Sequence, residues 1–156
     1  MERIYLFDWG NTLMVDFPDQ PGKMCGWEEI AIVPGAEELL RKLSQNSSIY
    51  IATGAADSTE HDIEQAFRRA GLHTYISGYF CYANTGIRKG TKDFLLHILR
   101  QLSAAPENVT VIGDSFENDI LPAAGLGIQA FWLTKTANRT LPDNVFAVGT
   151  LDRICR

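Results

Sequence analysis

Short apolar runs alternate with amphipathic helical patterns along most of this 156-residue chain, and this alternation limits the fold more than any other feature. The runs are rich in β-branched and aromatic residues, which favours buried strands. Expected strands cover residues 4–7, 49–52, 75–82, 109–112, 128–133 and 145–148. The helical patterns cover residues 36–43, 59–70 and 93–102, with a short helix after Pro122. Strands that alternate with helices predict one three-layer α/β domain over residues 1–156, with a mostly parallel central sheet.

The composition is that of an ordinary globular domain and argues against several classes of protein. The length is enough for one sizeable core. A net charge of −5 argues against nucleic acid as a partner, and no apolar run approaches the length of a membrane span. The first strand starts at residue 4, so no signal peptide is expected. Cys25, Cys81 and Cys155 have no paired spacing, so we expect neither disulfides nor zinc, and a cytoplasmic setting.

Polar side chains follow three of the expected strands at the point where each strand ends. Asp8 follows the first strand, Thr53 the second, and Asp114, after Gly113, the fourth. Reactive groups gather beyond the carboxyl ends of parallel strands, so these side chains are expected to lie close together. Each of them could instead simply close a turn. Asp119 adds a further carboxylate, and carboxylate oxygens are ligands that Mg²⁺ prefers.

The order of these residues, with a basic pair among them, is similar to that of a known family. Arg88 and Lys89 lie between the second strand and the fourth. Asp, Thr and Lys followed by Gly-Asp and a further Asp resembles the haloacid dehalogenase (HAD) superfamily of hydrolases, and the resemblance runs from Phe7 to Asp119. It implies a Rossmann-like fold and a phosphatase that acts through an aspartyl-phosphate, which water then hydrolyses.

The resemblance implies a role for each residue that matches the family pattern. Asp8 is the expected nucleophile. Thr53, together with Gly54 and Thr12, is expected to bind the substrate, with the Thr53 hydroxyl on a phosphoryl oxygen. Lys89 is expected to neutralise the nucleophile and the transferring group. The alternative for Thr53 is a turn cap without a catalytic role.

The same resemblance implies a Mg²⁺ site and leaves the identity of the site cation open. The expected metal ligands are three carboxylates and one backbone carbonyl, those of Asp8, Asp114, Asp119 and Gly10 respectively. Arg88 is expected to bind substrate or to replace Lys89 as the site cation, because a proline that usually follows the lysine is here Gly90. Both basic residues could instead be solvated surface charges.

Gly10 is a departure from the family pattern. Phosphatases of the family usually carry a second aspartate there, whose side chain protonates the leaving group and then activates water. Glycine keeps only the backbone carbonyl, so we expect metal binding to survive. General acid catalysis should be weakened by roughly 10²–10⁴-fold if nothing replaces it. Asp16, Asp19 and Asp57 are near enough in the sequence to be substitutes.

Two subfamilies without that carboxylate, and one regulatory role, are alternatives. Phosphonoacetaldehyde hydrolases have an Asp-Trp-Ala-Gly-Thr stretch similar to residues 8–12, but they need a lysine delivered by a cap domain. Haloacid dehalogenases act without Mg²⁺, whereas the pair of Asp114 and Asp119 is suited to hold it. The third alternative is a catalytically impaired Mg²⁺-binding regulatory module, although such a module needs no nucleophile.

Residues 14–33 contain prolines, glycines and Trp27, and are expected to form an irregular flap. Family members often carry a helical cap domain at this point. Residues 14–33 are too few and too irregular to form one, so the chain is expected to be capless. An open site would accept a small phosphorylated substrate or a large one, and a second copy of the chain could complete it in a homo-oligomer. Trp27 is expected either to plug the edge of the core or to form an aromatic lip over the site.

Overall fold

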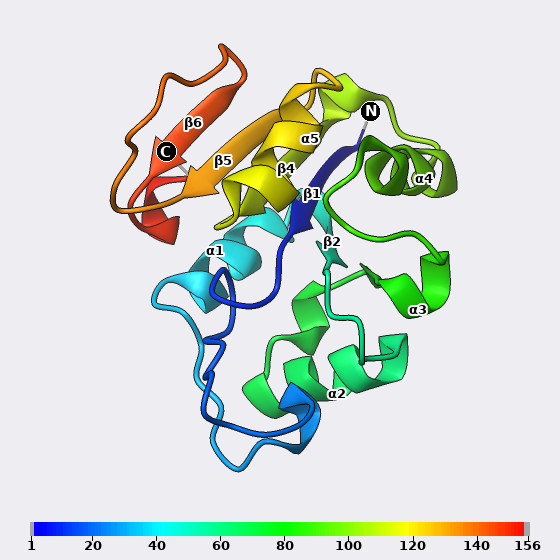
Figure 1. The fold of residues 1–156 in the computed structure, drawn as a ribbon, viewed down its shortest axis with the longest axis vertical. Helices are drawn as coiled ribbons and strands as arrows, with labels where there is room; N and C mark the ends of the chain where they lie inside the picture. The colour runs from blue at the N-terminus through cyan, green and yellow to red at the C-terminus, as the bar shows by residue number, and fades with distance from the viewer. Residues whose placement is uncertain (1, 155–156) are drawn as a thin grey trace.

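A six-stranded parallel sheet forms the centre of the protein (Figure 1). The structure, a computed structural model, describes residues 2–154. The spatial order of the strands is β3-β2-β1-β4-β5-β6. Their bounds are Arg3–Phe7 (β1), Ser47–Ala52 (β2), Gly78–Phe80 (β3), Val109–Gly113 (β4), Gln129–Leu133 (β5) and Val145–Val148 (β6). The α/β domain with a parallel sheet, predicted from the sequence, is confirmed.

Helices connect the strands, and the three long ones lie close to where the sequence placed them. The α-helices are Ala36–Leu43 (α1), Glu60–Ala70 (α2), Tyr82–Thr85 (α3), Lys92–Leu102 (α4) and Leu121–Ala124 (α5). A π-helical turn, Phe116–Ile120, leads into α5, and 3-10 turns cover Met24–Gly26, His73–Tyr75, Pro106–Asn108 and Leu151–Arg153. Among residues 2–154, no helix is both long and apolar enough to cross a membrane.

Both ends of α2 are capped by residue types that are typical of helix ends. The Thr59 hydroxyl accepts a hydrogen bond from the Asp62 backbone N–H, and the Asp62 carboxylate accepts one from the Thr59 N–H. This reciprocal capping box satisfies two backbone donors that the first helical turn leaves free. Gly71 ends the helix in the left-handed region, at φ 72°.

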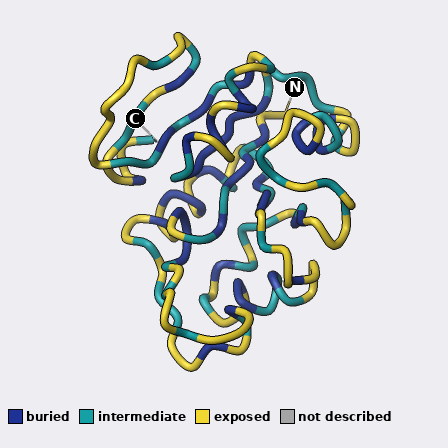
Figure 2. Tube along the Cα trace, viewed as in Figure 1, coloured by how far each residue is buried: buried dark blue, intermediate teal, exposed yellow. Residues whose placement is uncertain are grey.

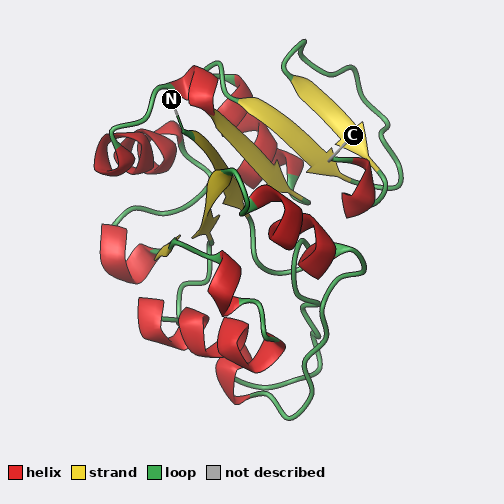
Figure 3. Cartoon of the chain, turned by 180° about the vertical axis from the view of Figure 1, so that it is seen from behind, coloured by secondary structure: helices red, strands yellow, loops and turns green. Residues whose placement is uncertain are grey.

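Residues on each strand alternate between two apolar cores, one on each face of the sheet. On β1, Leu6 belongs to the core formed with α4 and α5, whereas Phe7 belongs to the core formed with α1 and α2. Helices therefore cover both faces, as Figures 1 and 3 show from opposite sides. Figure 2 shows buried residues concentrated in the central strands. Strands that are buried on both faces have continuous apolar sequences, which explains why they could be predicted.

The strand predicted over residues 75–82 is much shorter than expected. Only Gly78–Phe80 pairs with β2, because the chain turns away on both sides. On the C-terminal side, the Asn84 side chain accepts a hydrogen bond from the Cys81 N–H at 2.9 Å and donates one to the Tyr79 carbonyl at 2.7 Å. These bonds replace sheet pairing and start helix α3, a competition that Asn side chains often win at turns.

Residues 14–33, the flap, run along the surface without regular structure apart from one 3-10 turn. The two ends of the flap meet, since Met14 forms an antiparallel bridge with Ile32. Its middle is tied to α2: the Arg69 guanidinium donates hydrogen bonds to two flap carbonyls, and Lys23 forms an ion pair with Asp62 at 2.9 Å. The flap is therefore held against the domain at both its ends and its middle.

Candidate active site

The candidate site lies where the order of the strands reverses in the sheet. β1 has the later strands β2 and β4 as its two neighbours, and Phe7 is level with Ile51 on one side and Ile112 on the other. The residues that follow these strands therefore reach the same edge. In open α/β sheets this switch point is where a crevice forms and where ligands bind.

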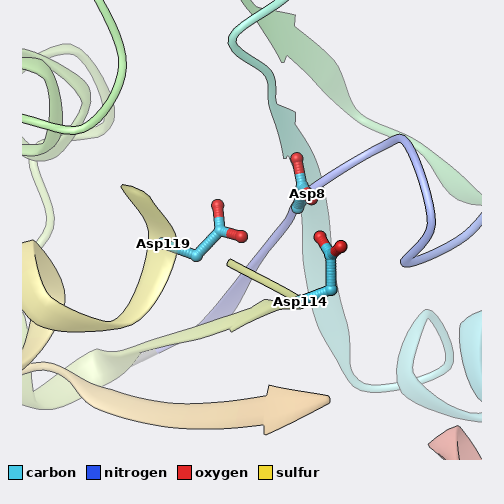
Figure 4. A group of neighbouring side chains, drawn as sticks. All are labelled: Asp8, Asp114 and Asp119. Atoms are coloured by element: carbon cyan, nitrogen blue, oxygen red, sulfur yellow. The ribbon is translucent and has the colours of Figure 1, made fainter. Parts of the chain in front are cut away.

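Three carboxylates converge at this edge (Figure 4). Asp8 extends from the end of β1, Asp114 from the end of β4, and Asp119 from the π-helical turn that follows. One oxygen from each carboxylate lies within 4.8 Å of the others. We call these residues the carboxylate cluster. The sequence placed Asp8 and Asp114 by their strands, whereas Asp119 reaches the cluster because the chain turns back after β4.

Lys89 is the cation that contacts the cluster. Its ammonium donates hydrogen bonds to Asp8 Oδ1 at 2.8 Å and to the Ala52 carbonyl at 2.7 Å, and it forms an ion pair with Asp119. All three ammonium protons can therefore be used at once. Arg88, the alternative candidate for the site cation, is exposed, and its guanidinium lies 5.3 Å from the centre of the Tyr82 ring.

The charges in the cluster are not balanced. Burial alone would raise the pKa of Asp8, but the charge and hydrogen bond of Lys89 and a hydrogen bond with Asp114 outweigh it and lower that pKa. Burial, and then the neighbouring Asp8, raises the pKa of Asp114 to about 7. Burial raises the pKa of Asp119 to about 6, despite the opposing effect of Lys89. One ammonium is too little positive charge for three carboxylates, so the cluster holds protons that a cation would replace.

Burial opposes the charge on Lys89, but Asp8 and Asp119 outweigh it and raise the pKa of the ammonium. Lys89 is therefore charged at neutral pH, with only 10% of its side chain exposed. Its position leaves the Asp8 carboxylate deprotonated, which is the state that a nucleophile requires.

Gly113 is required because Asp119 lies directly against it. A Cβ atom at residue 113 would lie 2.6 Å from the Asp119 Cβ and would overlap its carboxylate. The Ser115 backbone N–H fixes that carboxylate with a hydrogen bond to Oδ2 at 3.0 Å. The Gly-Asp pattern thus reflects close packing as well as charge.

The two threonines occupy different positions. Thr12 is fully buried, and its hydroxyl lies 3.1 Å from Asp8 Oδ2 and 3.3 Å from Asp114 Oδ1, so it faces the carboxylates and lines neither of the hollows described below. The Thr53 hydroxyl accepts a hydrogen bond from the Ala55 N–H at 3.1 Å. It caps the turn after β2, and its own proton stays available to donate.

Two adjoining hollows open onto Asp8 and Gly54. The first, of about 280 Å³, is otherwise lined mainly by Tyr82, Arg88, Lys89, Ser115 and Asn118. The second, of about 370 Å³, lies on the side of the flap, where Gly10, Asp16, Lys23, Trp27 and Thr53 contribute to its lining. Trp27 combines both expectations: it is 7% exposed, its indole N–H donates to the Gly22 carbonyl at 2.9 Å, and its ring forms part of the wall.

Comparison with known proteins places the chain in a family. A sequence model described as haloacid dehalogenase-like hydrolase matches residues 10–127. The chain belongs to this family. YfnB of Bacillus subtilis strain 168, named as a HAD-hydrolase, is 24% identical over 113 residues, which are 72% of this chain and 47% of YfnB. The pyrimidine 5'-nucleotidase YjjG of Escherichia coli K12 is 25% identical over 123 residues, which are 78% of this chain and 53% of YjjG.

The chain spans about half the length of the curated relatives it matches. Solved structures share its fold over more of its length. A protein from Listeria monocytogenes serotype 4b has a TM-score of 0.84 at 21% identity, covering 97% of this chain and 94% of that one. The structure of YfnB bound to magnesium has a TM-score of 0.75 at 16% identity, covering 97% of this chain and 96% of that one. The chain thus belongs to the HAD-like hydrolase family and has a HAD-like fold.

Sequence reasoning missed several residues around the site. Ser115 orients Asp119 through its backbone and accepts a hydrogen bond from the Asn118 N–H through its side chain. A Ser three residues before Asn at the start of a turn was the available signal. Tyr82 lines the first hollow from the start of helix α3, where the strand predicted over residues 75–82 would end, so no pattern indicated it.

Proposed function

We propose that the chain is a Mg²⁺-dependent phosphohydrolase that forms an aspartyl-phosphate on Asp8. The observation that carries this proposal is the contact between Lys89 and Asp8 at the strand switch point, which keeps the carboxylate deprotonated and in place. The E. coli relative is named as a nucleotidase, which supports phosphate ester chemistry. Small phosphorylated compounds are therefore the proposed substrates.

The carboxylate cluster has the chemistry to hold Mg²⁺. Its oxygens are grouped within 4.8 Å, and the raised pKa values of Asp114 and Asp119 indicate unbalanced negative charge. Asp8, Asp114 and the Gly10 carbonyl are the proposed direct ligands. Asp119 already accepts hydrogen bonds on both oxygens, so we place it in the outer shell, where it would act through water. A bound Mg²⁺ would screen the charge of the nucleophile and the phosphoryl group.

In the proposed reaction, an Asp8 oxygen attacks phosphorus and the bond to the leaving oxygen breaks. Lys89 neutralises charge on Asp8 and on the transferring group, and the Thr53 hydroxyl donates to a phosphoryl oxygen. Water then attacks the aspartyl-phosphate, which releases phosphate and restores the carboxylate. Each of the two steps needs a proton transfer from another group. In the first step the leaving oxygen gains a proton, and in the second the attacking water loses one.

Gly10 supplies neither of these proton transfers. We therefore propose that general acid catalysis is weaker than in family members with an aspartate at this position. Esters with acidic leaving groups should react best, because their leaving groups depart as anions without a proton.

The phosphonatase-like alternative requires an uncharged lysine amine that can reach the substrate. Lys23 lies in the wall of the second hollow, but its hydrogen bond and ion pair with Asp62 raise its pKa. This makes Lys23 a poor imine former at neutral pH. The dehalogenase-like alternative leaves the carboxylate cluster unexplained, since that reaction needs no metal.

We further propose that the flap serves in place of a cap domain.

Hydrolysis of nitrophenyl phosphate, acetyl phosphate and a nucleoside monophosphate panel tests the proposal. The wild-type protein should require Mg²⁺, lose activity with a chelator and regain it when Mg²⁺ is added. Asp8→Asn should abolish turnover, whereas Asp19→Asn, an exposed flap change that touches neither hollow, should not. A wild-type rate equal to that of Asp8→Asn would favour the regulatory-module alternative.

A further inference from the structure

The position left without a side chain at Gly10 faces another carboxylate. A Cβ atom at residue 10 would lie 3.4 Å from the Asp16 Cβ and 3.7 Å from its Oδ2. The backbone of Gly10 has no positive φ; the left-handed residue of this turn is Asn11, at φ 59°. The absence of a side chain at residue 10 therefore leaves room beside Asp16, and it is not imposed by the backbone.

Asp16 is held in place through its backbone. Its N–H donates to the Asn11 side-chain oxygen at 2.9 Å, while the Asn11 N–H donates to the Met14 carbonyl at 2.6 Å. The turn before it is anchored by Trp9, which is 4% exposed and packs against Phe67 with ring centres 6.0 Å apart. The loop that carries Asp16 is therefore tied to the same turn that carries Gly10.

The Asp16 carboxylate is free to react. Nothing in residues 2–154 pairs with it, it is exposed, and it lines the same hollow as Asp8 and Thr53. The other two substitutes suggested by the sequence are less suitable. Asp57 also lines this hollow, but its carboxylate accepts a hydrogen bond from the Ser58 hydroxyl at 3.2 Å. Asp19 lines neither hollow.

We propose that Asp16 is the general acid and base of this site and acts in the place of the missing carboxylate at position 10. This inference rests on the proposed function. In the first step, the bond between phosphorus and the leaving oxygen breaks as Asp8 attacks, and the Asp16 carboxylic acid gives its proton to that oxygen. In the second step, Asp16 takes a proton from the attacking water, the bond between phosphorus and Asp8 breaks, and phosphate leaves. Asp16 is then protonated again and Asp8 ionised, so the cycle closes.

The test compares leaving groups, because a lost acid and a damaged fold have different effects on them. We would measure kcat/KM for nitrophenyl phosphate and for ethyl phosphate with wild type, Asp16→Asn, Asp57→Asn and Asp19→Asn. Asp16→Asn should lower kcat/KM for ethyl phosphate by about 10²-fold and leave kcat/KM for nitrophenyl phosphate within about threefold, since a nitrophenolate needs no proton and kcat/KM does not include the later hydrolysis of the aspartyl-phosphate. Asp19→Asn should match wild type on both substrates. Adding Gly10→Asp to Asp16→Asn should restore part of the ethyl phosphate activity.

Each contrary result has a distinct meaning. An equal loss on both substrates would assign Asp16 a structural role, and no loss on either would show that it carries no proton; both overturn the inference. The same substrate-selective loss in Asp57→Asn, and not in Asp16→Asn, would move the role to Asp57. Nitrophenyl phosphate turnover that persists in Asp8→Asn would overturn the proposed function itself, and this inference with it. Activity that depends on Asp8 and shows no selective loss in Asp16→Asn would overturn only the inference.

Discussion

The Lys89 ammonium lies 2.8 Å from Asp8 Oδ1, although the two residues are 81 positions apart in the chain. This contact joins the end of the first strand to the loop before α4. It also fixes the protonation states of both groups, because each stabilises the charged form of the other.

Replacing Lys89 with Met should remove most of the activity. The variant leaves the Asp8 charge without its cation, and we expect kcat for nitrophenyl phosphate to fall about 10²–10³-fold. Arg88→Met is the matched control, since this exposed side chain stacks on Tyr82 instead of contacting the cluster. Steady-state kinetics of both variants check the prediction. A larger loss in Arg88→Met would mean that the site cation had been assigned to the wrong residue of the pair.

Mg²⁺ affinity should increase as the pH rises from about 5.5 to 7.5. Asp114 and Asp119 have pKa values raised to about 7 and about 6, so below these values protons neutralise the proposed direct ligand Asp114 and its outer-shell neighbour Asp119. Binding must displace those protons, which makes the affinity depend on pH. Titration calorimetry in two buffers of different ionisation enthalpy would measure the proton release directly. Binding without proton release at pH 6.5 would contradict it, and Asp114→Asn should both weaken binding and reduce the release.

Without Mg²⁺, these two carboxylates should make the folded protein less stable as the pH rises. Their folded pKa values lie above the unfolded value of 3.8, so the folded state binds more protons between these limits. Their contribution to the stability of the folded protein is complete below about pH 4 and is lost as the pH rises through about 6 to 7. Mg²⁺ should offset this loss, by about 2.7 kcal/mol at a hundred times its Kd. Thermal denaturation at pH 5 and 8, with and without Mg²⁺, provides the measurement; an equal Mg²⁺ effect at both would count against the cluster as the metal site.

Gly113→Ala and Gly10→Ala should differ sharply. A Cβ at residue 113 would overlap the Asp119 carboxylate, whereas one at residue 10 would only touch Asp16 at 3.4 Å. We expect Gly113→Ala to be destabilised by about 1–3 kcal/mol through overpacking, and to lose activity because Asp119 and Lys89 shift. Gly10→Ala should keep its stability. Chemical denaturation of both variants decides the matter, and equal stability of the two would show that Asp119 can move aside at little cost.

The sequence predicted the layers of the fold and the strand ends better than it predicted the turns. Strands buried on both faces and helices with one apolar face leave periodic patterns, as at Phe7 and in α4. Segments in which side chains compete with backbone pairing leave no periodic pattern. The sequence therefore did not indicate that hydrogen bonds of the Asn84 side chain shorten β3. The left-handed position in the first turn is at Asn11 and not at the neighbouring Gly10, which the residue types alone do not indicate. Which of Arg88 and Lys89 contacts Asp8 depends on side-chain direction, which spacing alone does not give.

The central position of β1 has a consequence for synthesis of the protein. The proposed nucleophile, Asp8, follows β1, which is made before the other five strands of this sheet, yet β1 occupies the middle of the sheet and has β4 as one neighbour. One edge of β1 therefore waits unpaired until residues 109–113 have been made. Asp114 and Asp119 arrive only after that strand, so a nascent chain that ends before them carries Asp8 without its carboxylate partners. The proposed chemistry at Asp8 would therefore have to wait during translation until β4 and the residues after it complete the site.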